Sequence, residues 1–373
     1  MWKHLIIPLF FAVTISAEFS LANAQAPGTS EPAASSSPSS EITELQKKAE
    51  AGDSSAAYAL GHAYETGKAV RQNYQLAAFW YRNGAEWGNA AAQSSLGVLY
   101  WFGEGVDKDK KEAVNWYHKA ARQGDANAMF NLGVAYYNGE GANVDDTLAY
   151  AWFMLASEAG SQAGRDAAKR SEAEHGKRNF GSACVAIGAM YEKGLELPLN
   201  LQLAIDWYKK AAQGEPGLDR SEAETRLISI FLNANNYSAA RPWCEALAKE
   251  GRPGGAFCLG HLYQHGLGVG QDLKAAFRWY EQGAKGGSTA AMLALGRMYE
   301  DGQGTKIDRP EAFLQFLLAA DHGDKGAAPE AIKARSLMDE NEWKTTQKKL
   351  KERHFNLAKV NSFLQSGGMH PSK

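Results

Sequence analysis

The sequence predicts an all-α protein, an α-solenoid of about seven helical hairpins with capping helices at its C-terminal end. Three observations support this prediction. Tryptophan recurs at intervals of 36 residues, with one longer interval of 55 residues. A Leu-Gly or Ile-Gly pair recurs in the same register, and a tyrosine follows each such leucine or isoleucine by four residues. A fixed period of this size indicates supersecondary units that stack on one another.

The N-terminal segment predicts a secretory signal peptide, residues 1–24, followed by a disordered linker, residues 25–40. Lys3 precedes an apolar run from Leu5 to Ile15, and Ala22-Asn23-Ala24 provides the small residues of a cleavage site. The alternative is an uncleaved anchor. Cleavage would leave no membrane span, so we expect a periplasmic or secreted protein. The linker QAPGTSEPAASSSPSS consists of small, polar and proline residues that have nothing to bury.

The repeat register defines two helices in each unit. The pairs of the first helix are Leu60-Gly61, Leu96-Gly97, Leu132-Gly133, Ile187-Gly188, Leu259-Gly260 and Leu295-Gly296. The tryptophans of the second helix are Trp80, Trp116, Trp152, Trp207, Trp243 and Trp279, with Gln315 at the seventh position. A small residue four positions before each leucine and the tyrosine four positions after it share one helical face. An alanine three residues before each tryptophan position does the same, so each unit is a hairpin.

Glycine is prominent in the first helix although it costs about 1 kcal/mol relative to alanine in a helix interior. The glycine of each Leu-Gly pair, such as Gly133, has no Cβ. We expect this to let the second helix of the hairpin approach the first closely. A later glycine, such as Gly139, follows three residues after the tyrosine. It predicts the end of the first helix in a left-handed conformation.

The register also divides the chain. Repeats 1–3 are expected over residues 41–160, a helical extension over 161–181 and repeats 4–7 over 182–325. Capping helices follow over 326–360, and a disordered tail over 361–373. The extension contains the charged stretch GRDAAKRSEAEHGKRNF and accounts for the long tryptophan interval.

These columns resemble the Sel1-like repeat, which belongs to a tetratricopeptide-like family. Together with the N-terminal segment, they resemble an exported bacterial member of that family. The motif A-x3-LG-x2-Y-x2-G is followed by loops such as GEGV and GLGV, and then by second helices such as AVNWYHKAARQG and AIDWYKKAAQG. The resemblance covers about residues 51–323. It implies an exported scaffold that binds another protein or peptide through the concave groove of its solenoid, as an adaptor or regulator in the cell envelope.

The sequence predicts no catalytic, cofactor-binding or metal-binding residue and therefore no enzyme. S-x-x-K, H-E-x-x-H and a Walker loop are all missing from the sequence. His261 and His265 are spaced for one helical face but lack a third ligand. The alternative function is a β-lactam-binding or β-lactam-hydrolysing enzyme of the cysteine-rich Sel1-like type. A net charge of −2 disfavours nucleic acid as a partner, and the oligomeric state is left open.

The sequence contains three cysteines, of which two are placed so that they could form a disulfide. Cys244 and Cys258 each lie seven residues from Gly251 at a predicted turn between antiparallel helices. That spacing is compatible with a disulfide and with two separate buried thiols, because the Cβ directions decide between them. Cys184 is expected to be buried.

The predicted groove is lined by the face of each first helix opposite its buried stripe. In the second and third units, apolar and aromatic side chains stand on or beside this face. Exposed aromatic clusters are typical of interaction sites, so we predict a partner-binding surface there. Its residues are Val98, Trp101, Phe102, Phe130, Val134 and Tyr137. The alternative is that the extension near 164–180 folds back and covers these side chains.

Overall fold

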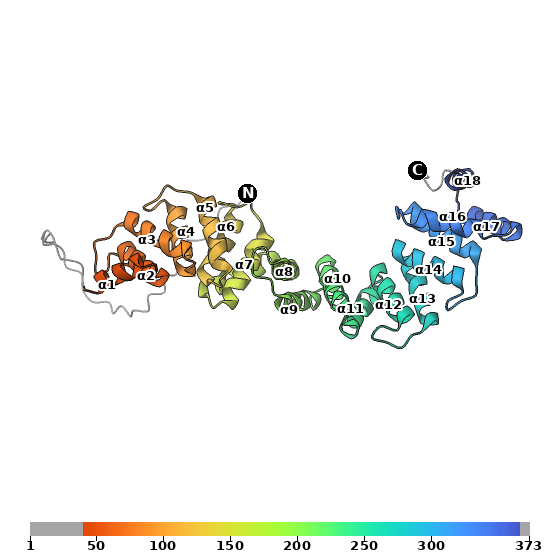
Figure 1. Cartoon of the computed structure of the whole chain (residues 1–373), viewed down its shortest axis with the longest axis horizontal. Coiled ribbons are helices and arrows are strands. Elements are labelled where there is room, and N and C mark those ends of the chain that lie inside the picture. Colours follow the sequence, from red (N-terminus) through yellow and green to blue (C-terminus); the bar gives the residue numbers. More distant parts are fainter. Residues whose placement is uncertain (1–39, 366–373) are drawn as a thin grey trace. The chain divides into compact units, whose positions relative to one another are not determined.

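The computed structural model describes residues 40–365, where it contains eighteen α-helices and no strand (Figure 1). The prediction of an all-α fold is confirmed. The signal peptide, nearly all of the linker and residues 366–373 of the tail lie outside the described residues. Two compact units make up the chain, and the boundary lies between Glu215 and Pro216.

The first unit contains one leading helix and four hairpins. Consecutive helices pack against each other along the unit. The helices are α1 (Ser40–Glu50), α2 (Ser54–Thr66), α3 (Tyr74–Glu86), α4 (Ala90–Phe102), α5 (Lys110–Ala121), α6 (Ala126–Asn138), α7 (Asp146–Glu158), α8 (Gln162–Lys193) and α9 (Leu201–Ala212). The helix α8 runs through the expected extension and continues as the first helix of the fourth hairpin. Its backbone leaves helical geometry at Gly176, where φ is 71°.

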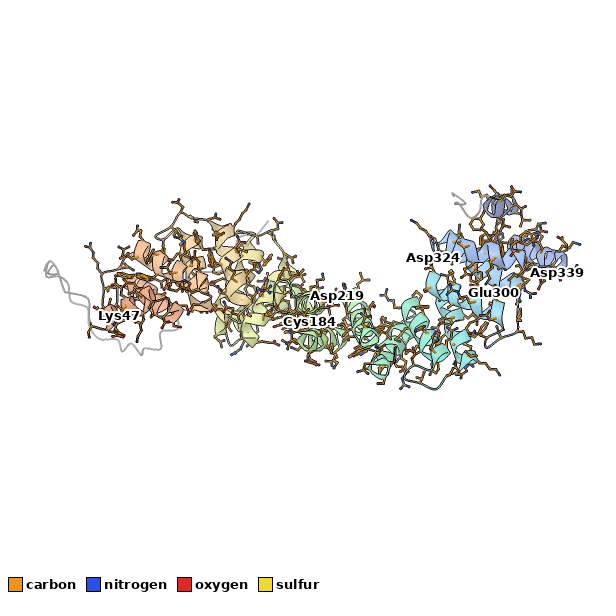
Figure 2. The ribbon with its side chains drawn as sticks, in the orientation of Figure 1. Lys47, Cys184, Asp219, Glu300, Asp324 and Asp339 are labelled. Atoms are coloured by element: carbon orange, nitrogen blue, oxygen red, sulfur yellow. A yellow bond between two sulfur atoms is a disulfide. The ribbon has the colours of Figure 1, made fainter. Side chains whose placement is uncertain are left out.

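The second unit contains three hairpins and three further helices. Its helices are α10 (Leu218–Asn233), α11 (Tyr237–Lys249), α12 (Pro253–His265), α13 (Leu273–Lys285), α14 (Thr289–Asp301), α15 (Arg309–Asp321), α16 (Ala327–Ser336), α17 (Glu340–Glu352) and α18 (Leu357–Gln365). In Figure 2, Asp219 marks α10, Glu300 marks α14 and Asp339 precedes α17.

The ends of the helices are specified by local sequence. Asp53 and Asn73 precede α2 and α3, and their side-chain oxygens accept hydrogen bonds from backbone N–H groups of the first turn. Such a cap contributes about 1 kcal/mol. Gly67 and Gly139 end α2 and α6 in the left-handed conformation, with φ of 71° and 68°. The predicted role of the later glycine is therefore confirmed.

The glycine of each Leu-Gly pair lies under an aromatic ring of the second helix. A Cβ atom at Gly97 would lie 2.6 Å from Tyr117 Cε1, closer than real contacts allow. Gly61, Gly188, Gly260 and Gly296 meet the residue after the tryptophan position in the same way, and Gly133 meets Phe153. The missing Cβ thus lets the two helices of a hairpin approach, as the sequence predicted.

The tryptophans pack between layers. Trp80, Trp116, Trp152 and Trp207 are buried, and Trp243 and Trp279 are half-buried against the core of the second unit. Trp80 packs in a cluster that includes Ile42 of α1, so α1 covers the first layer of the array.

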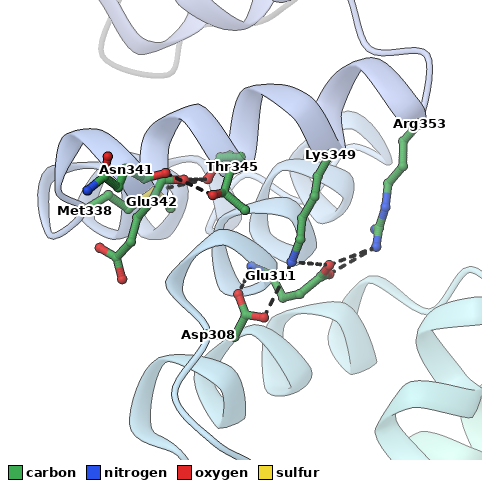
Figure 3. A network of polar contacts seen from close by, with 9 residues as sticks. Asp308, Glu311, Met338, Asn341, Glu342, Thr345, Lys349 and Arg353 are labelled. Carbon is green, nitrogen blue, oxygen red and sulfur yellow. Dashed lines mark hydrogen bonds and ion pairs between the residues drawn. The ribbon is translucent and has the colours of Figure 1, made fainter.

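The second unit ends in a polar junction between α17 and α15 (Figure 3). Lys349 Nζ lies 2.9 Å from Glu311 Oε1 and 3.5 Å from Asp308 Oδ2. Arg353 Nη2 lies 3.1 Å from Glu311 Oε2. Between the same two helices, Phe313 of α15 and Trp343 of α17 pack edge to face with ring centroids 5.7 Å apart. The apolar contact and the ion pairs together attach α17 to the last hairpin.

Candidate functional site

The first unit has a groove of about 520 Å³ formed mainly by α2, α4 and α6. These are the first helices of three successive hairpins, so equivalent faces of consecutive repeats line it. The loop after α4 and the start of α8 complete the lining. The lining residues are Tyr58, His62, Glu65, Ser94, Ser95, Val98, Phe102, Glu104, Asn127, Phe130, Asn131, Ser161 and Ala163.

Three of the six predicted partner-binding residues line this groove. Val98 and Phe102 come from α4, and Phe130 comes from α6. Phe102 is 39% exposed, and Phe130 packs against Phe153 with ring centroids 5.7 Å apart. Together they provide an apolar wall. Tyr137 is half-buried and does not line the groove.

The expectation that Trp101 and Val134 are exposed is wrong, because they are only 4% and 3% exposed. Trp101 packs against Tyr117 at 6.3 Å between ring centroids, and the ammonium group of Lys110 lies 4.9 Å from the centre of the indole. Val134 belongs to a core cluster with Ala167 of α8. The extension therefore covers Val134, which was the alternative left open by the sequence.

The polar side of the groove is organised around Glu65. The Tyr81 hydroxyl donates a hydrogen bond of 2.6 Å to Glu65 Oε2, and His62 Nδ1 lies 3.4 Å from the same oxygen. Tyr58 stacks on both His62 and Tyr81. Burial, and then the neighbouring Glu65 carboxylate, raise the pKa of Tyr81, so the phenol stays protonated and can donate. The Glu65 carboxylate is thus held in one position.

Two amides on α6 also line the groove. Asn127 and Asn131 are one helical turn apart, and Asn131 is only 8% exposed. Neither side chain makes a hydrogen bond within the described residues. An amide carries both donors and an acceptor. These two side chains can therefore bond to the N–H and C=O groups of a peptide backbone.

The lining carries negative charge. It contains the carboxylates of Glu65 and Glu104, and none of these described lining residues is lysine or arginine. Burial, and then Glu65 and Asp125, raise the pKa of Tyr58. Burial, and then Glu104 and Glu65, raise the pKa of Tyr74. Glu65 and Glu104 thus both contribute to the raised pKa of one phenol, that of Tyr74.

The sequence predicted the helix faces that line the groove, but the residues predicted to bind a partner did not include its polar groups. Glu65 stands five residues after its leucine, on the helix face predicted to line the groove, in a column that also holds glutamate or glutamine in other repeats, but the predicted partner-binding residues were all apolar or aromatic. The usable signal was the tyrosine that follows the tryptophan in four of the repeats. In three repeats that tyrosine donates to the acidic or amide side chain of this column, as Tyr208 does to Glu192 and Tyr280 to Gln264.

The two paired cysteines and the third cysteine lie apart from the groove. Cys244 of α11 and Cys258 of α12 form a disulfide, with a Cα–Cα distance of 5.8 Å. Cys184 of α8 is buried (Figure 2), and burial raises the pKa of its thiol to about 12. This thiol is therefore protonated and unreactive at neutral pH.

Among the side chains that the structure describes, no group of three or more His, Cys, Asp or Glu is arranged to hold a metal ion. His261 and His265 do lie together, with ring centroids 4.6 Å apart. Within residues 40–365, none of the helices has the length and apolar character that a membrane span requires.

Comparisons with known proteins agree with the repeat register. The model of the Sel1 repeat matches residues 54–89, 90–125, 126–161, 181–215, 255–288 and 289–324, together more than half of the chain. The hairpin α10–α11 lies between two of these matches.

Two solved structures are similar to the chain. A protective antigen of uropathogenic Escherichia coli strains that displays an SLR fold is 23% identical. The match covers 82% of this chain and 85% of that one, with a TM-score of 0.34. A Sel1 repeat protein from Oxalobacter formigenes is 27% identical, and the match covers 77% of each chain with a TM-score of 0.35. Among curated proteins, none shows significant similarity.

Proposed function

Because the chain belongs to the Sel1 repeat family, whose members generally act as non-enzymatic protein-interaction scaffolds, we propose that its first unit binds an extended segment of another protein in the groove of α2, α4 and α6. The observation that carries the proposal is the combination in one groove of an apolar wall and two amides without hydrogen-bond partners among the described residues.

The size and chemistry of the groove support a peptide segment as the ligand. A volume of about 520 Å³ falls within the range of sites that bind small ligands or a few side chains. Main-chain hydrogen bonds provide affinity in peptide recognition, and side-chain pockets provide specificity. In this groove, Asn127 and Asn131 can form the hydrogen bonds to the main chain. Val98, Phe102 and Phe130 form the surface on which a side chain of the peptide can pack.

The test is selection of binders from a random peptide library by the full chain. We expect peptides that bind the wild-type protein to bind Phe130→Ala more weakly by about 2 kcal/mol, roughly thirtyfold. Asn131→Leu removes the amide with little change in volume and is expected to weaken the same peptides.

The matched control is Phe257→Ala in the second unit. Phe257 occupies the same repeat position as Phe130 and packs on Tyr280 at 5.8 Å, but it does not line this groove. Its truncation therefore removes a comparable contact and should leave peptide affinity unchanged. Peptides whose affinity falls equally with Phe257→Ala, or does not fall with Phe130→Ala, would place binding elsewhere.

We further propose that the protein is an exported adaptor or regulator of the cell envelope. The signal-peptide pattern of residues 1–24 supports export, and a disulfide is typical of proteins in oxidising compartments. Mass spectrometry of the protein from producing cells should give an N-terminus at Gln25. A chain that retains Met1 and remains in the cytoplasm would contradict this proposal.

A further inference from the structure

We infer that the segment bound in this groove carries a lysine or arginine side chain, which the carboxylates of Glu65 and Glu104 receive beside the apolar wall. This inference rests on the proposed function and specifies the chemistry of the partner.

Glu65 is arranged as a ready acceptor. Its side-chain contacts with Tyr81 and His62 both use Oε2. Its Oε1 has no hydrogen bond from any side chain that the structure describes. Because Tyr81 is fully buried and holds the carboxylate from behind, Glu65 loses little side-chain freedom when a ligand binds. A fixed carboxylate with one open oxygen suits a cationic donor.

Glu104 provides the second negative charge. It follows Gly103, which ends α4, and it is half-buried at the rim of the groove. No ion pair to Glu104 occurs among the described residues. Nearby Lys110 cannot neutralise it while engaged elsewhere, since its ammonium lies 2.6 Å from Glu140 and over the Trp101 ring. No lysine or arginine among the described lining residues therefore compensates the two carboxylates, and His62 is the basic side chain in contact with Glu65.

The apolar wall determines what surrounds the cation. Tyr58, Val98, Phe102 and Phe130 line the same groove as the two carboxylates. The methylene groups of lysine or arginine can pack on such a surface while the charged end reaches a carboxylate. The chain's own linker, residues 25–40, is an unsuitable occupant because its one charged residue is Glu31. Complementarity therefore points to a basic segment of another protein.

The experiment uses the full chain and a random dodecapeptide library as the probe. Peptides enriched on the wild-type protein should contain lysine or arginine more often than the starting library. The best such peptide is then compared with its Lys→Met or Arg→Met version, which should bind about tenfold more weakly, as expected for loss of one charge-assisted hydrogen bond.

The protein variants remove charge without removing the fold. Glu65→Gln can still accept from Tyr81, because Gln264 accepts from Tyr280 at 2.8 Å in the equivalent position of another repeat. We expect Glu65→Gln and Glu104→Gln each to weaken the basic peptide about tenfold and to reduce the salt dependence of binding. Glu104→Lys should shift the enriched peptides toward aspartate and glutamate.

The matched control is Glu192→Gln. Glu192 accepts from Tyr208 at 2.6 Å just as Glu65 accepts from Tyr81, but it does not line the groove. It should leave the affinity of the basic peptide unchanged, so a general effect of the substitution on the fold is excluded.

The outcomes separate this inference from the proposed function. Peptides that require Phe130 but show no enrichment of lysine or arginine, or that bind Glu65→Gln and Glu104→Gln normally, would overturn the inference and leave the groove as a binding site. If no enriched peptide depends on Phe130 or Asn131, the proposed function fails, and the inference fails with it.

Discussion

The packing of an aromatic ring on the glycine of each Leu-Gly pair predicts opposite effects for two glycine substitutions in the single helix α12. A Cβ at Gly260 would lie 2.5 Å from Cδ1 and Cε1 of Tyr280. The ring is buried, and its hydroxyl donates to Gln264, so it cannot turn aside without losing that bond. Gly254 lies in the first turn of the same helix, and an added Cβ would meet no atom within 4 Å.

The expected magnitudes follow from these distances. Inserting a methyl group into a packed contact costs about 1–3 kcal/mol, while alanine gains up to about 1 kcal/mol of helix propensity over glycine. Because the clash at Gly260 is with a ring that cannot move aside, the upper part of the cost range applies. After the propensity gain is subtracted, Gly260→Ala should lower the free energy of unfolding by about 1–2 kcal/mol. Gly254→Ala should raise it by about 0.4–1 kcal/mol, because it restricts the unfolded chain without a clash.

The assay is urea unfolding of the full chain, monitored by circular dichroism. The midpoints of the variants are compared at the same dependence of the unfolding free energy on urea concentration. The double variant Gly260→Ala, Tyr280→Leu tests the cause. Once the ring is removed, adding Gly260→Ala should cost little beyond Tyr280→Leu alone. The reasoning is refuted if Gly260→Ala is as stable as the wild type, or if its cost is the same with and without the Tyr280 ring.

Three other predictions concern the core, pH and the disulfide. Trp116 packs in a cluster with Tyr81 and Leu96. Trp116→Ala should therefore lower the free energy of unfolding by about 3–5 kcal/mol, measured by the same urea assay. Burial lowers the pKa of His118, so the unfolded chain binds the proton more readily and stability is lost as pH falls below about 6.5. In His118→Met, the melting temperature should change less with pH over that range. A pH dependence equal to that of the wild type would contradict this cause. Reduction of the disulfide between Cys244 and Cys258, which are 14 residues apart, should lower stability by about 3 kcal/mol, whereas a Cys244→Ala, Cys258→Ala variant should not respond to the reductant.

The sequence predicted the features of the fold that repeat. The period, the left-handed glycines and the close approach at the Leu-Gly pairs all depend on contacts made within one hairpin, and six copies of each column made them visible. The first-helix face that lines the groove followed from helical periodicity, which is why Val98, Phe102 and Phe130 lie there.

The features that do not repeat were harder to predict. Trp101 stands where Glu65 and Gln264 accept from a tyrosine in other repeats, and its indole packs on Tyr117 instead. Periodicity places that position on the helix face but does not report a side chain reaching across from the second helix. Val134 is buried because α8 covers it, and the course of a single insertion has no second copy to compare.

The polar lining was not among the predicted partner-binding residues for a related reason. Glu65, Glu104 and Asn131 are ordinary residues for a solvated helix end or loop when taken one at a time. They become a site because stacking brings α2, α4 and α6 together, at a spacing that no single repeat contains.

Hydrogen–deuterium exchange of the full chain, with and without a selected basic peptide, tests the central claim most directly. If the groove binds the peptide, the amides that gain protection lie in α2, α4 and α6, and Phe130→Ala abolishes the gain while Phe257→Ala preserves it. Protection confined to α10–α15, or protection in α2, α4 and α6 that survives Phe130→Ala, would contradict the account.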